Sequence, residues 1–221
     1  MNRKVPNILD YEAVIFDLDG TLIDSMGMWG EIDIEYLERF GIEVPENLQR
    51  ELEGLRFTEV AEYFRERFGI SDSIEEIGQT WIDMAEYKYR HDIPLKPGAR
   101  ELIGKMAENG VRMAIASSNH LRLIEEILRI HGISEYFDVI TTCDDVTASK
   151  PEPDVYLYTA EKLGTSPSSC LVFEDIPIGI LSGKRAGMTV AAVYDTYSEN
   201  VREQKEREAD FFIQDYYELL G

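Results

Sequence analysis

Short apolar runs alternate with helical patterns from residue 98 onward, and this alternation constrains the fold most strongly. A helical pattern separates successive runs rich in Val, Ile, Ala and Leu, which lie at residues 111–116, 139–142, 170–173 and 190–193. Near-continuous apolar runs are typical of buried parallel strands, and regular alternation with helices predicts a parallel sheet with helices on both faces. The sequence therefore predicts an α/β fold, with a Rossmann-like parallel core that ends in an edge strand at residues 210–213.

One further apolar run, residues 12–16, precedes this alternation and ends directly before Asp17. The run continues into Asp17-Leu18-Asp19-Gly20-Thr21. Ligands of open α/β sheets bind at the carboxyl ends of strands, where both acids are expected. Two carboxylates this close repel each other unless a cation or a proton lies between them. A polar turn is the plain alternative, but the order of strand, paired acids and Gly-Thr favours a functional site.

Residues 24–94 show helical patterns and no strand-like run. Met28, Ile32 and Tyr36 share one helix face, and Ser73 with Glu76 has the form of a capping box. This stretch interrupts the α/β part directly after its first strand. We expect a helical cap domain of residues 24–94 inserted into a core domain formed by residues 1–23 and 95–221.

Three more polar motifs follow predicted strands. They are a serine pair before an asparagine, a lysine between a serine and a proline, and a second pair of acids: Ser117-Ser118-Asn119, Ser149-Lys150-Pro151 and Glu174-Asp175. Taken singly, each has an ordinary explanation as a helix cap or a solvated loop. Those explanations do not account for two acidic pairs at the ends of parallel strands. A shared divalent cation does, because Mg²⁺ binds one or two carboxylates together with phosphate oxygens and water.

The four motifs together resemble those of the haloacid dehalogenase superfamily of phosphotransferases, over nearly the whole chain. Residues 17–21 match the family's D-x-D-G-T nucleophile motif, and residues 150–153 match its K-P-x-P motif. The helical insert after the first motif resembles that of the β-phosphoglucomutase-like branch. The resemblance implies a Mg²⁺-dependent phosphohydrolase that acts on a small phosphorylated metabolite through an aspartyl-phosphate intermediate.

The resemblance also implies a role for each catalytic residue. Asp17 would be the nucleophile, and Asp19 would protonate the leaving oxygen and later deprotonate the attacking water. Ser117 and Ser118 would bind phosphoryl oxygens. Lys150 would neutralise the nucleophile and the phosphoryl group together.

The resemblance implies a metal site made from the two acidic pairs. Asp17 and Asp175 would be direct side-chain ligands of Mg²⁺. The backbone carbonyl of Asp19 would be a third ligand, and Glu174 would bind the ion directly or stabilise its ligands. A dehalogenase resembles this chain in fold but lacks the second acid of the first motif, so Asp19 favours phosphoryl chemistry.

The cap determines whether such an enzyme is a phosphatase or a mutase. Sugar phosphomutases of this branch carry a His and an Arg at cap positions that here hold Trp29 and Phe57, and they tend to carry Val where this chain has Thr21. Arg56 could partly replace the Arg. Met28, Trp29 and Arg56 are the candidate substrate contacts in the cap. A phosphatase is favoured, a sugar phosphomutase is the alternative, and a non-catalytic binding protein on the same fold is the third.

Composition limits the partners. The net charge of −21 argues against nucleic acid and anionic membranes, which reward clustered Lys and Arg. No apolar run is long enough to span a bilayer, and no secretion signal is recognisable after the basic first residues. The two cysteines, Cys143 and Cys170, lie in apolar runs and are expected to be reduced. We therefore expect a cytoplasmic monomer.

Overall fold

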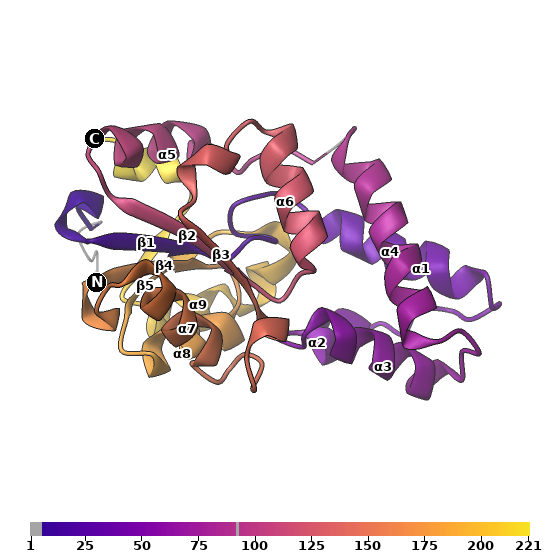
Figure 1. The fold of residues 1–221 in the computed structure, drawn as a ribbon. Coiled ribbons are helices and arrows are strands. Elements are labelled where there is room, and N and C mark those ends of the chain that lie inside the picture. Colours follow the sequence, from indigo (N-terminus) through magenta and orange to yellow (C-terminus); the bar gives the residue numbers. More distant parts are fainter. Residues whose placement is uncertain (1–5, 92) are drawn as a thin grey trace.

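A six-stranded parallel sheet lies at the centre of the protein, as seen in a computed structural model that describes residues 6–91 and 93–221 (Figure 1). The strand order is β3-β2-β1-β4-β5-β6. The strands are β1 (Ala13–Phe16), β2 (Arg112–Ser117), β3 (Val139–Thr142), β4 (Cys170–Glu174), β5 (Thr189–Val193) and β6 (Phe211–Ile213). The predicted Rossmann-like sheet is confirmed, and the last strand lies at its edge. The predicted domain limits include residues 1–5 and Asp92, which lie outside the described residues.

Helices cover both faces of the sheet (Figure 1). They are α5 (Ala99–Glu108) and α6 (Leu121–Ile130) on one face, and α7 (Asp154–Leu163), α8 (Pro177–Arg185) and α9 (Arg202–Glu208) on the other. The side chains of β1 alternate between the two layers: Val14 and Phe16 pack into one apolar cluster, and Ala13 and Ile15 into the other. Because both faces are covered, every residue of β1 is apolar and buried.

The described residues between β1 and α5 form four helices: α1 (Met26–Glu38), α2 (Leu48–Leu52), α3 (Phe57–Phe68) and α4 (Ile74–Tyr89). The predicted capping box opens α4, where the Ser73 hydroxyl accepts from the Glu76 amide and the Glu76 carboxylate accepts from the Ser73 amide. Figure 1 shows the insert extending beyond one end of the sheet. The predicted all-helical cap is therefore present.

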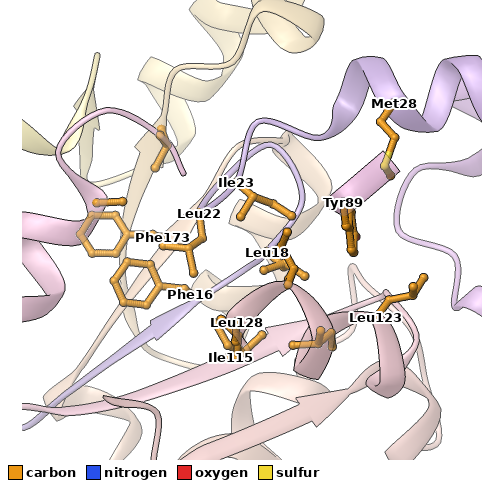
Figure 2. Packing of buried hydrophobic residues seen from close by; sticks show 14 of the residues in the cluster. Phe16, Leu18, Leu22, Ile23, Met28, Tyr89, Ile115, Leu123, Leu128 and Phe173 are labelled. Carbon is orange, nitrogen blue, oxygen red and sulfur yellow. The ribbon is translucent and has the colours of Figure 1, made fainter. Parts of the chain in front are cut away.

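One apolar cluster runs from the sheet into the inserted helices (Figure 2). Phe16 and Phe173 stack in the sheet with ring centroids 5.1 Å apart. Leu18 continues the cluster beyond the strand end towards Met28 and Tyr89 of the insert. The insert is thus packed on the core by buried apolar side chains as well as tethered by the chain.

The two chain crossings between core and insert lie side by side. The Asp24 amide donates to the Pro94 carbonyl at 3.0 Å, and the Lys96 amide donates to the Leu22 carbonyl at 2.9 Å. The Lys96 ammonium forms ion pairs with Asp24 and with the buried Asp195. These contacts join both crossings to the core. Within the described part of the chain, each helix is too short or too polar to traverse a lipid bilayer.

Candidate active site

The register of the sheet brings the first and fourth motifs to the same edge. Phe16 of β1 is level with Ile115 of β2 and with Phe173 of β4. The residues directly after Phe16 and Phe173 therefore lie side by side at this edge of the sheet. The Asp17 amide donates to the Phe173 carbonyl at 3.0 Å. Carboxylate oxygens of Asp17, Glu174 and Asp175 all lie within 4.8 Å of one another.

Lys150 reaches this edge from the loop before α7. Its buried ammonium donates to Asp17 Oδ1 at 2.8 Å and to Glu174 Oε1 at 2.6 Å. Burial alone would lower the pKa of Lys150, but the charges of Asp17 and Glu174 outweigh it and hold that pKa well above its usual value. Lys150 therefore stays a cation beside the expected nucleophile.

Glu174 is fully buried, and its two oxygens have different surroundings. Oε1 accepts from Lys150 and from the Tyr156 hydroxyl, whereas Oε2 is a buried oxygen without a hydrogen-bond partner among the described residues. Burial raises the pKa of Glu174 to about 7 despite the opposing charge of Lys150. Gly179 of α8 permits this arrangement, since a Cβ there would lie 2.1 Å from the Glu174 carboxyl carbon.

The acidic cluster fits a metal ion. Burial, together with the charges of Asp17 and Glu174, raises the pKa of Asp175 well above its usual value. Among the described residues that line the site, Lys150 is the one cation beside three carboxylates, Lys205 acts on Asp175 from behind it, and Glu174 Oε2 has no hydrogen-bond partner. A divalent cation would satisfy this excess of oxygen ligands, and hard oxygen ligands suit Mg²⁺, Ca²⁺ or Mn²⁺. Asp17, Glu174 and Asp175 can therefore hold a metal ion.

Asp19 is held by three donors from different segments. Its Oδ1 accepts from the Ser25 hydroxyl at 2.6 Å and from the Trp29 indole at 2.8 Å. Its Oδ2 accepts from the side-chain amide of Asn119 at 2.7 Å. Burial raises the pKa of Asp19, although the donors at Ser25 and Trp29 oppose the shift. A raised pKa and a fixed orientation suit an acid that exchanges a proton with the substrate.

The serine motif lies beside this acid. Ser117 ends β2 and is buried, and its hydroxyl oxygen accepts from the backbone amide of Asn119 at 3.1 Å. Ser117, Ser118 and Asn119 line the same cavity as Asp17 and Asp19. The sequence around Asn119 predicts a helix cap, whereas the structure shows that its side chain binds Asp19. The signal was present, because a polar side chain two residues beyond a strand end can reach the neighbouring strand's motif.

The cavity extends from the strand ends to the inserted helices and has a volume of about 230 Å³. Trp29 is partly exposed on its wall, and a contact between Trp29 and a substrate stays a prediction. The structure corrects the other two cap candidates. Met28 is buried in the apolar cluster beside Tyr89, and Met26, half a helical turn earlier, lines the cavity instead (Figure 2).

Arg56 is the second cap candidate that the structure places elsewhere. Its guanidinium forms an ion pair with Glu59 and donates to the Val146 carbonyl, and it is absent from the described residues that line the cavity. Phe57 takes the cavity position. Arg56 turns away because α3 begins at Phe57, and Glu59 in its first turn accepts from the Arg56 amide and its side chain.

Comparisons with known proteins agree with this site. A family model described as haloacid dehalogenase-like hydrolase matches residues 14–193. Hexitol phosphatase B of Escherichia coli strain K12 is 31% identical over 85% of this chain and 86% of its own. A phosphorylated carbohydrates phosphatase of Thermotoga maritima is 32% identical over 80% of this chain and 82% of its own. The crystal structure of a putative β-phosphoglucomutase from Thermotoga maritima matches with a TM-score of 0.72 and 28% identity, over 95% of this chain and 97% of its own.

The chain belongs to the haloacid dehalogenase-like hydrolase family. The predicted resemblance to this family and to its β-phosphoglucomutase-like branch is confirmed, as is the expectation of an enzyme of the hydrolase class. The matched segment contains the whole acidic cluster together with Lys150 and the serine motif.

Proposed function

We propose that this enzyme hydrolyses the phosphoric monoester of a small polar metabolite, through an aspartyl-phosphate on Asp17 and with Mg²⁺ as cofactor. The observation that carries the proposal is the convergence of Asp17, Lys150 and the acidic cluster at one sheet edge, with Asp19 held beside them. The names of the relatives from Escherichia coli and Thermotoga maritima support a phosphorylated carbohydrate as the substrate class.

In the first half-reaction, an Asp17 oxygen forms a bond to phosphorus while the bond from phosphorus to the leaving oxygen breaks. Protonated Asp19 gives its proton to that oxygen, and the raised pKa of Asp19 supports this role. In the second half-reaction, Asp19 takes a proton from water, which attacks phosphorus and releases Asp17. Ser117 and the charge of Lys150 stabilise the phosphoryl oxygens.

Asp17, Glu174 and Asp175 would hold the Mg²⁺ ion, with the Asp19 backbone carbonyl as a further ligand. When bound, the ion supplies positive charge that offsets the charge of the carboxylates and of the phosphoryl group. Thr21 helps to orient Asp175, because its hydroxyl donates to Asp175 Oδ1 at 3.1 Å.

Residues 24–94 would act as a cap that closes over the site and excludes bulk water during transfer. The paired crossings at Asp24 and Lys96 lie where such a motion would bend the chain. The division into a cap and a core of residues 1–23 and 95–221 is part of this proposal. The cytoplasmic location and the monomeric state stay predictions from sequence.

The test uses p-nitrophenyl phosphate. We expect hydrolysis with Mg²⁺, none after thorough treatment with EDTA, and recovery when Mg²⁺ is added back. Full activity in EDTA would overturn the metal assignment. Binding of phosphorylated metabolites without any turnover would favour a non-catalytic binding protein.

A sugar phosphomutase is the second candidate, and the likeness to the putative β-phosphoglucomutase structure favours it. The assay supplies β-glucose 1-phosphate with a trace of the bisphosphate, and it measures glucose 6-phosphate and free phosphate together. We expect free phosphate to dominate. Rapid isomerisation without phosphate release would overturn the phosphatase proposal.

A further inference from the structure

The wall of the cavity opposite the strand ends carries a buried acid that the proposed chemistry does not use. Asp33 lies on α1, is 6% exposed, and lines the cavity one helical turn beyond Trp29. Its Oδ2 accepts from the Gln49 side-chain amide of α2 at 2.5 Å. Among the described residues nothing donates to Asp33 Oδ1, and Oδ1 is not fully buried either.

Burial of the Asp33 carboxyl lowers the stability of the folded protein. Burial raises the pKa of Asp33 to about 7, and the hydrogen bond from Gln49 only partly opposes the shift. No cation is paired with Asp33 among the described residues. A buried carboxyl without an ionic partner is rare in a core, and destabilising groups of this kind concentrate at functional sites.

The charged residues that line the cavity limit which chemical groups of a substrate can lie against Asp33. Lys150 is the one cation among the described residues that line the cavity, and it lies at the strand ends between Asp17 and Glu174. The cap side contributes the acids Asp33 and Glu53. A second phosphate or a carboxylate at that end of a substrate would meet like charge beside the buried Asp33, which is unfavourable.

Hydroxyl groups match the polar atoms that remain. Asp33 Oδ1 accepts a hydrogen bond, and the Gln49 amide group, after donating to Asp33, still has its carbonyl oxygen to accept another. Trp29, Phe57 and Trp81 line the same cavity, and C–H groups of a substrate can pack against their rings.

We propose that Asp33, together with Gln49, determines specificity by accepting hydrogen bonds from hydroxyl groups of the leaving group, so that the enzyme prefers monophosphates whose far end is uncharged and hydroxylated. The inference rests on the proposed phosphatase function and names the substrate class for the same site. It assigns the recognition of the leaving group to α1 and α2 and not to Met28 or Arg56.

The experiment compares four substrates with wild-type protein and Mg²⁺: glucose 6-phosphate, n-hexyl phosphate, fructose 1,6-bisphosphate and glucosamine 6-phosphate. We expect kcat/KM for glucose 6-phosphate to exceed those for n-hexyl phosphate and for the bisphosphate at least about tenfold, since a site built for hydroxyl groups rejects analogues that lack them. Equal values would overturn the proposal. A tenfold preference for glucosamine 6-phosphate over glucose 6-phosphate would overturn the inference that the far end of the preferred substrate is uncharged.

Two variants locate the preference. Asp33→Leu and Gln49→Leu should each reduce the ratio of kcat/KM for glucose 6-phosphate to that for n-hexyl phosphate at least about fivefold, mainly through KM. Glu38→Gln, an exposed acid on the same helix, is the matched control and should leave the ratio unchanged. An unchanged ratio in both folded cavity variants would overturn the assignment, and Gln49→Leu decides alone if Asp33→Leu does not fold.

The two proposals fail in different ways. If p-nitrophenyl phosphate and n-hexyl phosphate are hydrolysed without any preference for the hydroxylated substrate, only the role of Asp33 fails. If no substrate turns over, the phosphatase proposal fails. The preference then remains measurable by calorimetry, as the ratio of the dissociation constants of Asp17→Asn protein for glucose 6-phosphate and n-hexyl phosphate.

Discussion

The two ends of the cavity differ in the kind of side chain that lines them. At the strand ends, the buried ammonium of Lys150 lies within hydrogen-bond distance of both Asp17 and Glu174, and the three residues come from separate segments joined by the sheet. At the cap wall, aromatic and aliphatic side chains surround two acids, Asp33 and Glu53, and the hydrogen-bond partner of Asp33 is a neutral side-chain amide. The first end combines acids with a cation, whereas the described residues of the second end include acids but no cation.

The two ends are suited to different tasks. A dense set of fixed charges stabilises a transferring phosphoryl group, whatever is attached to it. An apolar wall with few polar atoms discriminates between attached groups, because each of its hydrogen bonds must be matched. We therefore expect substitutions at the strand ends to abolish turnover and substitutions at the wall to change substrate choice or stability.

Asp17→Asn should give the largest effect, a loss of turnover of at least about 10³-fold with the fold retained. An amide is nearly isosteric but cannot act as the nucleophile, and Lys150 keeps its ion pair with Glu174. Phosphate release and circular dichroism measure the two properties. Appreciable turnover, with deamidation excluded by mass spectrometry, would mean that the nucleophile is another residue.

Trp81→Ala and Trp29→Ala compare two aromatic residues of the wall. Trp81 is 2% exposed and packs edge-on against Phe64, so its truncation should cost about 3–5 kcal/mol of unfolding free energy. Trp29 is partly exposed and donates to Asp19, so its truncation should lower kcat/KM more than stability. Thermal denaturation measures the effect of each substitution on stability, and steady-state kinetics measures its effect on kcat/KM. A loss of stability at Trp29 with unchanged kinetics would contradict its place in the site.

Asp33→Asn should change how stability depends on pH. The folded pKa of about 7 lies above the ordinary 3.8, so the protonated form is favoured by folding; this stabilisation is complete below about pH 4 and is lost as pH rises through 7. At 1.36 kcal/mol per pKa unit the loss is at most about 4 kcal/mol.

The measurement is urea denaturation of both proteins at pH 5 and pH 8. The variant should lose less stability than the wild type between these two values, and other titrating groups cancel in the difference. Asp19 and Glu53 line the same cavity and are present in both proteins. Identical losses in the two proteins would show that Asp33 is not buried as described.

Gly179→Ala should give the smallest effect, a loss of about 2 kcal/mol in unfolding free energy together with lower kcat, since the new methyl group would collide with the Glu174 carboxylate. Gly104→Ala on α5 is the matched control. A Cβ there meets nothing within 4 Å, so the same change should raise stability by up to about 1 kcal/mol. Equal effects at both glycines would mean that Glu174 can move aside without cost.

The order of strands and helices and the motifs at the strand ends were predictable from sequence. Buried parallel strands are apolar on both faces, so β1 and β4 are recognisable as uninterrupted runs that stop at an acid. The charged run of residues 199–208 predicts one helix, but α9 begins at Arg202, because Asp195 caps a preceding 3₁₀ turn by accepting from the Tyr197 amide. Local capping of this kind shifts element boundaries without altering the fold.

The cap side was predicted less well. Met28 and Met26 are two positions apart on one helix, and only the packing of α1 against Tyr89 and its neighbours determines which of them faces the cavity. Asp33 had no signal in the sequence, because an acid on a helix is ordinarily solvent-exposed. Its burial depends on α2, which brings Gln49 against it.

The parallel core, the helical insert and the polar residues at the strand ends are encoded locally, because strand period, helix period and paired acids are properties of short stretches. The contacts of Asn119 and Trp29 with Asp19, and the position of Asp33 rather than Arg56 on the cavity wall, depend on the packing of distant segments. The physical reason is that helix packing angles and side-chain directions arise from contacts between segments far apart in the chain, which no single stretch of residues encodes.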